Sequence, residues 1–329
     1  MRRREFITFT AGAAAMWPSL ARSQRPEPVR RVGVFLSFYG NEAFWRAYLA
    51  AFKERLRELG WTEGRNIRYE ERLVGESQTQ LRGAVADLIA STPDVIFVTT
   101  NPATAMVTRA TRTIPVVFAS VSDSVGSGFV TNLARPGKNV TGFHNYEVSI
   151  VGKWMEILKE LSPGVRRVSI LHDPEIAANV AFLRAAESFS GPVGVKVVPG
   201  RVHEGTEMEG VITEFAKEPG GGLVVIPNPI NQITSDELIM LAERLRLPAI
   251  YPFSNFAASG GLASYGIDRM QQVREAASYV DRILRGADPG DLPVQLPTKY
   301  EFVINLKTAK ALGLNIPQAV LSRADQVIQ

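Results

Sequence analysis

Small polar side chains follow several predicted strands of this chain, and such groups are well suited to holding a small polar ligand. The clearest case is Thr99, Thr100 and Asn101, which come directly after the β-branched and aromatic run 95–98. That run is typical of a strand buried on both faces of a parallel sheet. Asn101 is predicted to cap the next helix, with Pro102 at the first helical position. The free N–H groups of that helix end would face the crevice in which open α/β sheets bind ligands.

The same pattern recurs at strand ends in both halves of the chain. Hydroxyl groups and helix N–H groups suit a ligand carboxylate, and the carboxylate of Asp123 or Asp173 could pair with an ammonium group. The rings of Phe38, Tyr146 and Phe253 could enclose an apolar side chain. Each aromatic residue could instead be a packing residue, and each aspartate a helix cap. The candidate ligand-binding residues are Ser37, Phe38, Asn41, Thr99, Thr100, Asn101, Ala103, Ser120 and Asp123 from the first half, and Asn145, Tyr146, Asp173, Asn228, Tyr251, Phe253 and Tyr265 from the rest of the chain.

No set of residues has the spacing of a catalytic or metal-binding motif. The histidines, His144, His172 and His203, are scattered and do not form an HExxH pattern. The chain contains no GxSxG elbow, P-loop or GxGxxG motif, and the glycines at 220–222 precede a predicted strand, as in a turn. We therefore expect a protein that is not an enzyme and that holds no metal or cofactor.

Strands and helices are predicted to alternate along the chain. The predicted strands are 31–36, 67–72, 95–98, 114–119, 140–143, 168–171, 193–198, 223–226, 248–253, 260–265 and 300–306. The predicted helices are 42–59, 78–90, 103–111, 148–161, 177–188, 206–217, 234–245, 269–285 and one that ends at 312. This alternation predicts βαβ units and doubly wound parallel sheets, and therefore an α/β fold.

Two lobes are expected from this pattern. Lobe I is predicted to comprise residues 30–142 plus about 257–292, and lobe II residues 143–256 plus about 293–329. A chain that crosses between two domains more than once builds a hinge of several strands. Such a hinge suits closure of the domains around a ligand.

The first residues are predicted to be an export signal at 1–23. Three arginines precede a mild apolar stretch at 6–20, and Ala21-Arg22-Ser23 has the small-x-small pattern of a cleavage site. Arg3-Arg4-Glu5-Phe6-Ile7 is similar to the twin-arginine consensus, and the three arginines also suit an ordinary secretory signal. The alternative is a frayed cationic terminus on a cytosolic protein.

Composition limits the partners that the exported chain could have. Without residues 1–23 the formal net charge of +4 falls to +1, because that segment holds four arginines and one glutamate. A nearly neutral chain offers no electrostatic basis for binding nucleic acid. The chain has no cysteine, which excludes disulfides, thiolate metal sites and a lipid-modified cysteine. We therefore expect a soluble periplasmic protein without a lipid anchor.

Several longer stretches resemble one known family closely. They are Thr113-Ile-Pro-Val-Val-Phe118, Ser122-Asp123, Arg135-Pro-Gly-Lys-Asn-Val-Thr-Gly142, Leu247-Pro-Ala-Ile-Tyr-Pro-Phe253 and Pro297-Thr-Lys-Tyr-Glu-Phe-Val-Ile-Asn-Leu-Lys-Thr-Ala-Lys-Ala-Leu-Gly313. From about residue 30 to 328 the chain resembles the ABC transporter substrate-binding family whose better-known members bind tryptophan or tyrosine, with the type I periplasmic-binding-protein fold. The resemblance implies two Rossmann-like lobes, three crossovers and a ligand in the cleft between the lobes. It also implies delivery of the ligand to a membrane permease driven by a cytoplasmic ATPase.

The chain departs from the family pattern at two places. Family members commonly carry Asp-Pro-Val after the fourth strand, where this chain has Asp123-Ser124-Val125. They often carry Gly-Thr before the helix of the opening motif, where this chain has Thr100-Asn101. Both departures fall in loops expected to contact the ligand, so they bear on the identity of the ligand more than on the fold.

The resulting hypothesis is an exported, monomeric solute-binding protein for an ABC permease. Its ligand is expected to be an amino acid or a similar carboxylate that bridges the two lobes. One alternative is a periplasmic sensor subunit that uses the same fold to report ligand occupancy to a membrane receptor. Two further alternatives are an exported enzyme with a Rossmann-like core and a transcription regulator. The chain shows no catalytic motif for the first and carries an export signal in place of a helix-turn-helix for the second.

Overall fold

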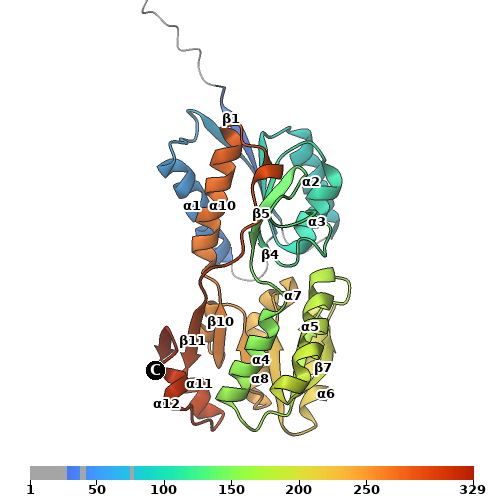
Figure 1. The fold of residues 1–329 in the computed structure, drawn as a ribbon, viewed down its shortest axis with the longest axis vertical. Coiled ribbons are helices and arrows are strands. Elements are labelled where there is room, and N and C mark those ends of the chain that lie inside the picture. Colours follow the sequence, from blue (N-terminus) through green and yellow to red (C-terminus); the bar gives the residue numbers. More distant parts are fainter. Residues whose placement is uncertain (1–27, 38–41, 75–77) are drawn as a thin grey trace, which may run out of the picture.

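The computed structural model describes residues 28–37, 42–74 and 78–329. Two α/β lobes lie one above the other and are joined by several segments of chain (Figure 1). The predicted export signal lies outside the described residues, as do the candidate ligand residues Phe38 and Asn41. Within the described part, no helix is long and apolar enough to cross a membrane.

Lobe I is built on a parallel sheet of five strands in the order β2-β1-β3-β4-β5. The strands are β1 (Arg30–Ser37), β2 (Ile67–Val74), β3 (Val95–Thr99), β4 (Val116–Val121) and β5 (Val140–His144). Every residue of β3 is buried, as its unbroken apolar run predicts. The helices α1 (Glu42–Glu58) and α10 (Arg269–Leu284) pack on one face, and α2 (Gln78–Ala90) and α3 (Asn101–Ala110) pack on the other. Figure 1 shows α10 beside α1, although some two hundred residues separate them in the sequence.

Lobe II is built on a sheet of seven strands in the order β12-β11-β10-β9-β8-β6-β7. The strands are β6 (Arg167–His172), β7 (Lys196–Arg201), β8 (Gly221–Val225), β9 (Ala249–Tyr251), β10 (Ala263–Gly266), β11 (Glu301–Asn305) and β12 (Gln326–Ile328). All neighbouring pairs are parallel except β10 and β11. The predicted α/β fold with two Rossmann-like parallel-sheet lobes is thus confirmed.

The helices of lobe II cover both faces of its sheet. They are α4 (Ile150–Leu161), α5 (Ala177–Val193), α6 (Met208–Ala216), α7 (Pro229–Ile233), α8 (Ser235–Arg244), α9 (Ser254–Ala258), α11 (Leu306–Ala311) and α12 (Gln318–Leu321), with 3₁₀ turns η1 (Gly205–Glu207) here and η2 (Pro289–Asp291) in lobe I. Gly221 faces Phe215 of α6, and its neighbour Gly222 faces Leu158 of α4. Successive strand residues point to opposite faces, so α6 and α4 lie on opposite sides of β8.

Three segments connect the lobes. The first follows β5, the second runs from β10 through Ile267 to α10, and the third runs from η2 to β11 and pairs Gln295 with Phe143. We predicted the second crossover near residue 257, but the structure places it about ten residues later. Residue Ala263 of β10 pairs with Ile250 of β9, which keeps α9 and β10 in lobe II.

Local structure departs from the sequence prediction at a few element ends. The helix expected to end at 188 continues to Val193, where Gly194 ends it with a φ of 71°, so β7 begins three residues later than the predicted strand. The short elements α7, α9, α12 and β12 were not predicted, because segments of three to five residues carry little periodic signal.

Candidate ligand-binding cleft

A polar pocket lies between the two lobes, and side chains from both lobes form its walls. The empty space among these side chains, including the part open to solvent, is about 430 Å³. Ends of β3, β4 and β8, and the starts of α3, α5, α7 and α10, supply most of the lining. The lining residues are Trp45, Thr100, Asn101, Pro102, Ser120, Ser122, Asn145, Ile176, Asn179, Pro227, Asn228, Pro229, Gln232, Phe253 and Arg269.

The turn after β3 forms part of the lobe I wall, and its geometry corrects one prediction. Asn101 is the first residue of α3 and not its cap, because Thr100 occupies the cap position. The Asn101 side chain instead ties this turn to the turn after β4: its Nδ2 donates to Ser122 O at 2.7 Å, and its Oδ1 accepts from Ser122 N at 2.9 Å. The hydroxyl oxygens of Ser37 and Thr100 lie 3.1 Å apart behind the wall.

Backbone strain is concentrated at these turns. Thr100 has a φ of 72°, Ser120 of 57° and Asp123 of 47°, which are left-handed values that side-chain-bearing residues adopt at a cost of about 1–3 kcal/mol. Across the described ranges only Thr92 and Arg246 share this property among non-glycine residues. Strain of this kind commonly accumulates at ligand sites, where it fixes polar groups in one orientation.

Several buried polar atoms in and behind the pocket have no hydrogen-bond partner among the described residues. Ser120 Oγ and Asn145 Oδ1 belong to lining residues, and the Thr99 Oγ1 and Tyr48 hydroxyls lie buried in lobe I. The Ser120 and Tyr48 hydroxyls lie near each other without the geometry of a hydrogen bond. Burial raises the pKa of Tyr48 to about 12, against a smaller lowering by the Ser120 hydroxyl, so the phenol is neutral at pH 7. A buried polar group without a partner costs about 1–3 kcal/mol. A bound ligand that reaches the Ser120 and Asn145 groups would remove that cost.

The lobe II wall is held by a network of amide side chains. Asn228 caps α7, because its Oδ1 accepts from Ile230 N at 2.9 Å, and its Nδ2 donates to Asn179 Oδ1 at 2.8 Å. Asn179 also accepts from Asp173 N at 3.0 Å. These bonds fix the ends of β6 and β8 against each other at the edge of the pocket.

Arg269, the first residue of α10, brings a positive charge into the pocket. Its guanidinium carbon lies 3.9 Å from the ring centre of Phe44 and 4.2 Å from that of Phe253. It donates to Gln232 Oε1 at 3.0 Å and to Asn255 Oδ1 at 2.9 Å. Only 7 % of the residue is exposed, and burial lowers its pKa to about 10, so it remains charged at pH 7.

The structure places the predicted ligand residues in distinct groups. Those that line the pocket are Thr100, Asn101, Ser120, Asn145, Asn228 and Phe253. The other predicted residues that the structure describes do not line it. Ser37, Thr99, Ala103, Tyr146 and Tyr251 are buried, and so is Asp173, whereas Asp123 and Tyr265 are partly exposed. The main lining residues that sequence reasoning missed are Trp45, Ser122, Ile176, Asn179, Gln232 and Arg269.

The tyrosines and aspartates set aside in this way have structural roles. The Tyr146 hydroxyl donates to Pro252 O and accepts from Ile267 N at 3.2 Å, and the Tyr251 ring stacks inside lobe II. Asp123 Oδ1 accepts from Gly126 N at 2.9 Å. Asp173 Oδ1 accepts from Glu175 N at 2.8 Å. Both carboxylates therefore stabilise turns, and neither lines the pocket.

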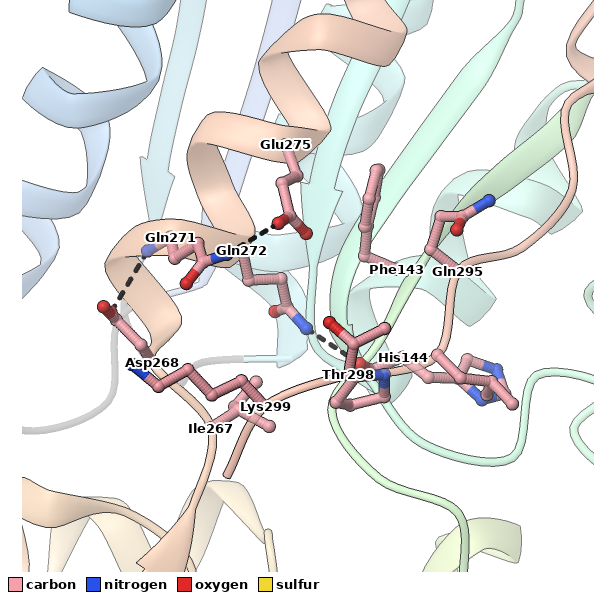
Figure 2. A pocket seen from close by; sticks show the side chains of 12 residues that line it. Phe143, His144, Ile267, Asp268, Gln271, Gln272, Glu275, Gln295, Thr298 and Lys299 are labelled. Atoms are coloured by element: carbon pink, nitrogen blue, oxygen red, sulfur yellow. Dashed lines mark hydrogen bonds between the residues drawn. The ribbon is translucent and has the colours of Figure 1, made fainter. Parts of the chain in front are cut away.

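A second pocket lies among the crossovers themselves (Figure 2). Gln272 reaches from α10 toward the first crossover, where its Nε2 donates to His144 O at 2.8 Å. Its Oε1 accepts from Ser120 N at 3.1 Å. One side chain therefore joins a crossover, the start of α10 and a wall of the polar pocket.

His144, in the first crossover, is expected to make stability depend on pH. Its Nε2 accepts from Ser124 N at 3.1 Å, and burial lowers its pKa from 6.5 to about 4. Between these pH values the unfolded chain binds more protons than the folded one, so the free energy of unfolding falls as the pH drops from 6.5 to 4. The full contribution is about 3 kcal/mol. Denaturant titrations of the wild type and His144→Gln at several pH values measure it.

A matched control for this experiment is His203, which is exposed on lobe II. The hydrogen bond with Asp173 raises the pKa of His203, so its contribution is present below pH 6.5 and is lost as the pH rises through its folded-state pKa. Replacing His203 therefore leaves the loss of stability toward acid in place. Equal acid sensitivity in the wild type and in His144→Gln would contradict the assignment.

Across residues 28–37, 42–74 and 78–329, no group of three His, Asp or Glu residues could hold a metal ion. The polar pocket, the two lobes and the three crossovers together define a type I periplasmic-binding-protein fold.

Comparison with known proteins shows the family. The family model described as ABC transporter substrate binding protein matches residues 42–328, so this chain belongs to that family, whose members bind solutes and are not enzymes. A tyrosine-binding protein of Clostridioides difficile (strain R20291) is 23 % identical over 269 residues, which are 80 % of this chain and 75 % of that protein.

Two solved structures share the fold over most of this chain. A conserved domain protein from Vibrio cholerae aligns with a TM-score of 0.85 and 26 % identity, over 91 % of this chain and 99 % of that one. An ABC domain from Streptococcus pneumoniae in complex with L-Trp aligns with a TM-score of 0.84 and 23 % identity, over the same shares of the two chains.

Proposed function

We propose that this chain is the exported solute-binding component of an ABC importer and that it binds an amino acid or a similar carboxylate between its lobes. The observation that carries this proposal is a pocket whose walls come from both lobes and which lies next to the first and second crossovers, at Asn145 and Arg269. A relative described as tyrosine-binding and a similar structure that contains L-Trp favour a ligand of this kind.

The mechanism is closure of the lobes about the hinge. A ligand that contacts Asn101 of lobe I and Asn228 of lobe II at once is bound more tightly when the lobes are close, so it shifts the population toward the closed form. A shift from 1 % to 99 % closed requires about 5.5 kcal/mol of differential affinity. The permease would then distinguish the closed, loaded protein from the open, empty one.

Export and delivery complete the proposal. The predicted signal at 1–23 would direct the chain to the periplasm, where it acts as a soluble monomer and presents its ligand to a membrane permease. The chain would have no nucleic-acid partner, because without the signal its net charge is close to zero. Co-purification of the loaded protein with a receptor kinase in place of a permease would instead support the sensor role.

The test is thermal unfolding of the purified protein against a panel of amino acids, other small carboxylates and sugars. A ligand at about 100 times its Kd adds about 2.7 kcal/mol of stability, which raises the Tm by several degrees. Small-angle scattering with and without each hit measures closure as a decrease in the radius of gyration, and it also reports the oligomeric state. A folded protein that no solute stabilises would contradict the proposal.

A further inference from the structure

We propose that the cleft selects a solute with a carboxylate and without an ammonium group, and that Arg269 holds the carboxylate. This inference rests on the proposed function, because it assumes that the pocket between the lobes is the solute site. It narrows the ligand from amino acids and related acids to simple carboxylates, and it assigns the residue that determines this specificity.

No described carboxylate compensates the charge of Arg269. Its hydrogen bonds go to the neutral amide oxygens of Gln232 and Asn255, and no carboxylate of the described residues forms an ion pair with it. The two flanking rings leave only 7 % of the residue exposed. A buried charge is costly unless it is paired, and a guanidinium matches a carboxylate with two parallel hydrogen bonds. An anionic ligand would therefore supply the negative charge that pairs with this guanidinium.

The described walls of the pocket offer no carboxylate to pair with an ammonium ion. The lining residues that the structure describes include Arg269 but no aspartate or glutamate. The carboxylates of Asp123 and Asp173 are turned to backbone N–H groups outside the pocket, and that of Asp268 caps α10 at Met270 N. An α-amino acid bound here would lose the hydration of its ammonium group without gaining a negative partner. Its affinity would therefore be lower than that of the same compound without the ammonium group, by about tenfold or more.

The remaining lining groups suit a neutral body. Asn145 Oδ1 and Ser120 Oγ are buried without partners and can bond a hydroxyl or amide of the ligand. Pro102, Ile176 and Pro229 provide apolar surface in the lining. The Phe253 ring also lines the pocket, and the Arg269 guanidinium covers one part of it. The chemical class that fits is a carboxylate attached to an apolar or aromatic body, with or without a hydroxyl.

The test uses four compounds that share one aromatic body. They are 3-phenylpropanoate, its neutral primary amide, 3-phenylpropylamine and L-phenylalanine, with the 4-hydroxyphenyl and indolyl versions of each alongside. Calorimetry on the purified wild type is expected to show the carboxylate binding at least tenfold more tightly than both the amide and the amino acid, with no measurable binding of the amine. An amino acid that binds as tightly as its deaminated acid, or more tightly, would overturn the proposal.

Variants at one helix assign the effect to one side chain. In Arg269→Gln the ratio of acid to amide affinity is expected to fall to about one, and Arg269→Lys is expected to retain a part of it. A general loss of folding would lower the affinities for the acid and for the amide equally, so it would leave their ratio unchanged. Arg274→Gln is the matched control, because Arg274 lies on the same helix, is half exposed and is 4.0 Å from Glu58. A ratio that survives in Arg269→Gln would exclude Arg269 as the anion-binding group.

Glu42 needs its own variant. Glu42 is the first residue of α1, its side chain lies outside the described residues, and Glu42→Gln is expected to leave the preference for the acid over the amino acid unchanged. A selective loss of amino-acid binding in this variant would show that Glu42 meets an ammonium group, and the proposal would fall. A sugar as the only stabilising solute would overturn this proposal and leave solute binding intact. The absence of any stabilising solute would end the proposed function and this inference with it.

Discussion

Replacing Gly266 with alanine is expected to cause a large loss of stability, because this residue ends β10 where the chain leaves lobe II. A Cβ atom here would lie 1.8 Å from Pro252 O and 2.4 Å from the Tyr146 hydroxyl oxygen. Neither group can withdraw, because the Tyr146 hydroxyl bonds both Pro252 O and Ile267 N. Overpacking together with a broken buried hydrogen bond costs about 3–5 kcal/mol. Denaturant unfolding of the wild type and the variant measures this difference.

The same substitution elsewhere in lobe II serves as the control. Gly210 lies on the exposed side of α6, and a Cβ atom there would meet nothing within 4 Å. Gly210→Ala is expected to stabilise the protein by about 0.5–1 kcal/mol, because alanine is the better helix former. If Gly266→Ala is as stable as Gly210→Ala, the contacts of Tyr146 do not hold the second crossover in place, and the prediction is wrong.

The lobes could be predicted because the longer strands each carry their own signal. The run 95–98 is buried on both faces and the helices show apolar residues at three- and four-residue spacing, so local pattern and tertiary position agree. The position of the second crossover was less predictable. The segment 260–265 has a strand pattern that fits either sheet, and its pairing with β9 assigns it to lobe II.

The candidate site was predictable where it is made of strand ends. Thr100, Ser120 and Asn228 line the pocket because the carboxyl ends of parallel strands meet at one edge of each sheet. Residue type could not show which strand-end side chains turn inward. Tyr146 and Asp123 have the chemistry of ligand contacts, yet one fills the core and the other caps a turn.

Arg269 could not have been placed from its neighbours in the sequence. It reaches the pocket because the chain crosses from β10 back to lobe I and starts α10 at the boundary between the lobes. Its partners, Gln232 and Asn255, lie in the short helices α7 and α9, which were not predicted from the sequence. A signal was present in the cap at Asp268, which marks a helix start directly after a strand.

The partnership of Arg269 leads to a prediction in which stability and binding change in opposite directions. Gln232→Glu keeps the shape of the side chain and places a carboxylate where the amide oxygen now lies, 3.0 Å from the guanidinium. Hydrogen bonds between charged groups contribute about 1.5–3 kcal/mol, so the unliganded variant is expected to be more stable than the wild type. A ligand carboxylate must then displace the new ion pair, and its affinity is expected to fall about ten- to hundredfold. Unfolding experiments without ligand and calorimetry with 3-phenylpropanoate measure the two effects.

The combination of the two effects separates specific competition from damage to the fold. A variant that harms packing would lose stability and affinity together. A new carboxylate paired with Arg269 would instead raise the stability of the unliganded protein and lower its affinity for the ligand carboxylate. Asn255→Asp tests the same guanidinium through its second partner and is expected to show the same pair of changes, because Asn255 Oδ1 accepts from Arg269 at 2.9 Å. Glu243→Gln, an exposed change on lobe II, is expected to alter neither quantity. Unchanged carboxylate affinity in Gln232→Glu would mean that the ligand binds elsewhere in the cleft, and that Arg269 serves only to join the lobes.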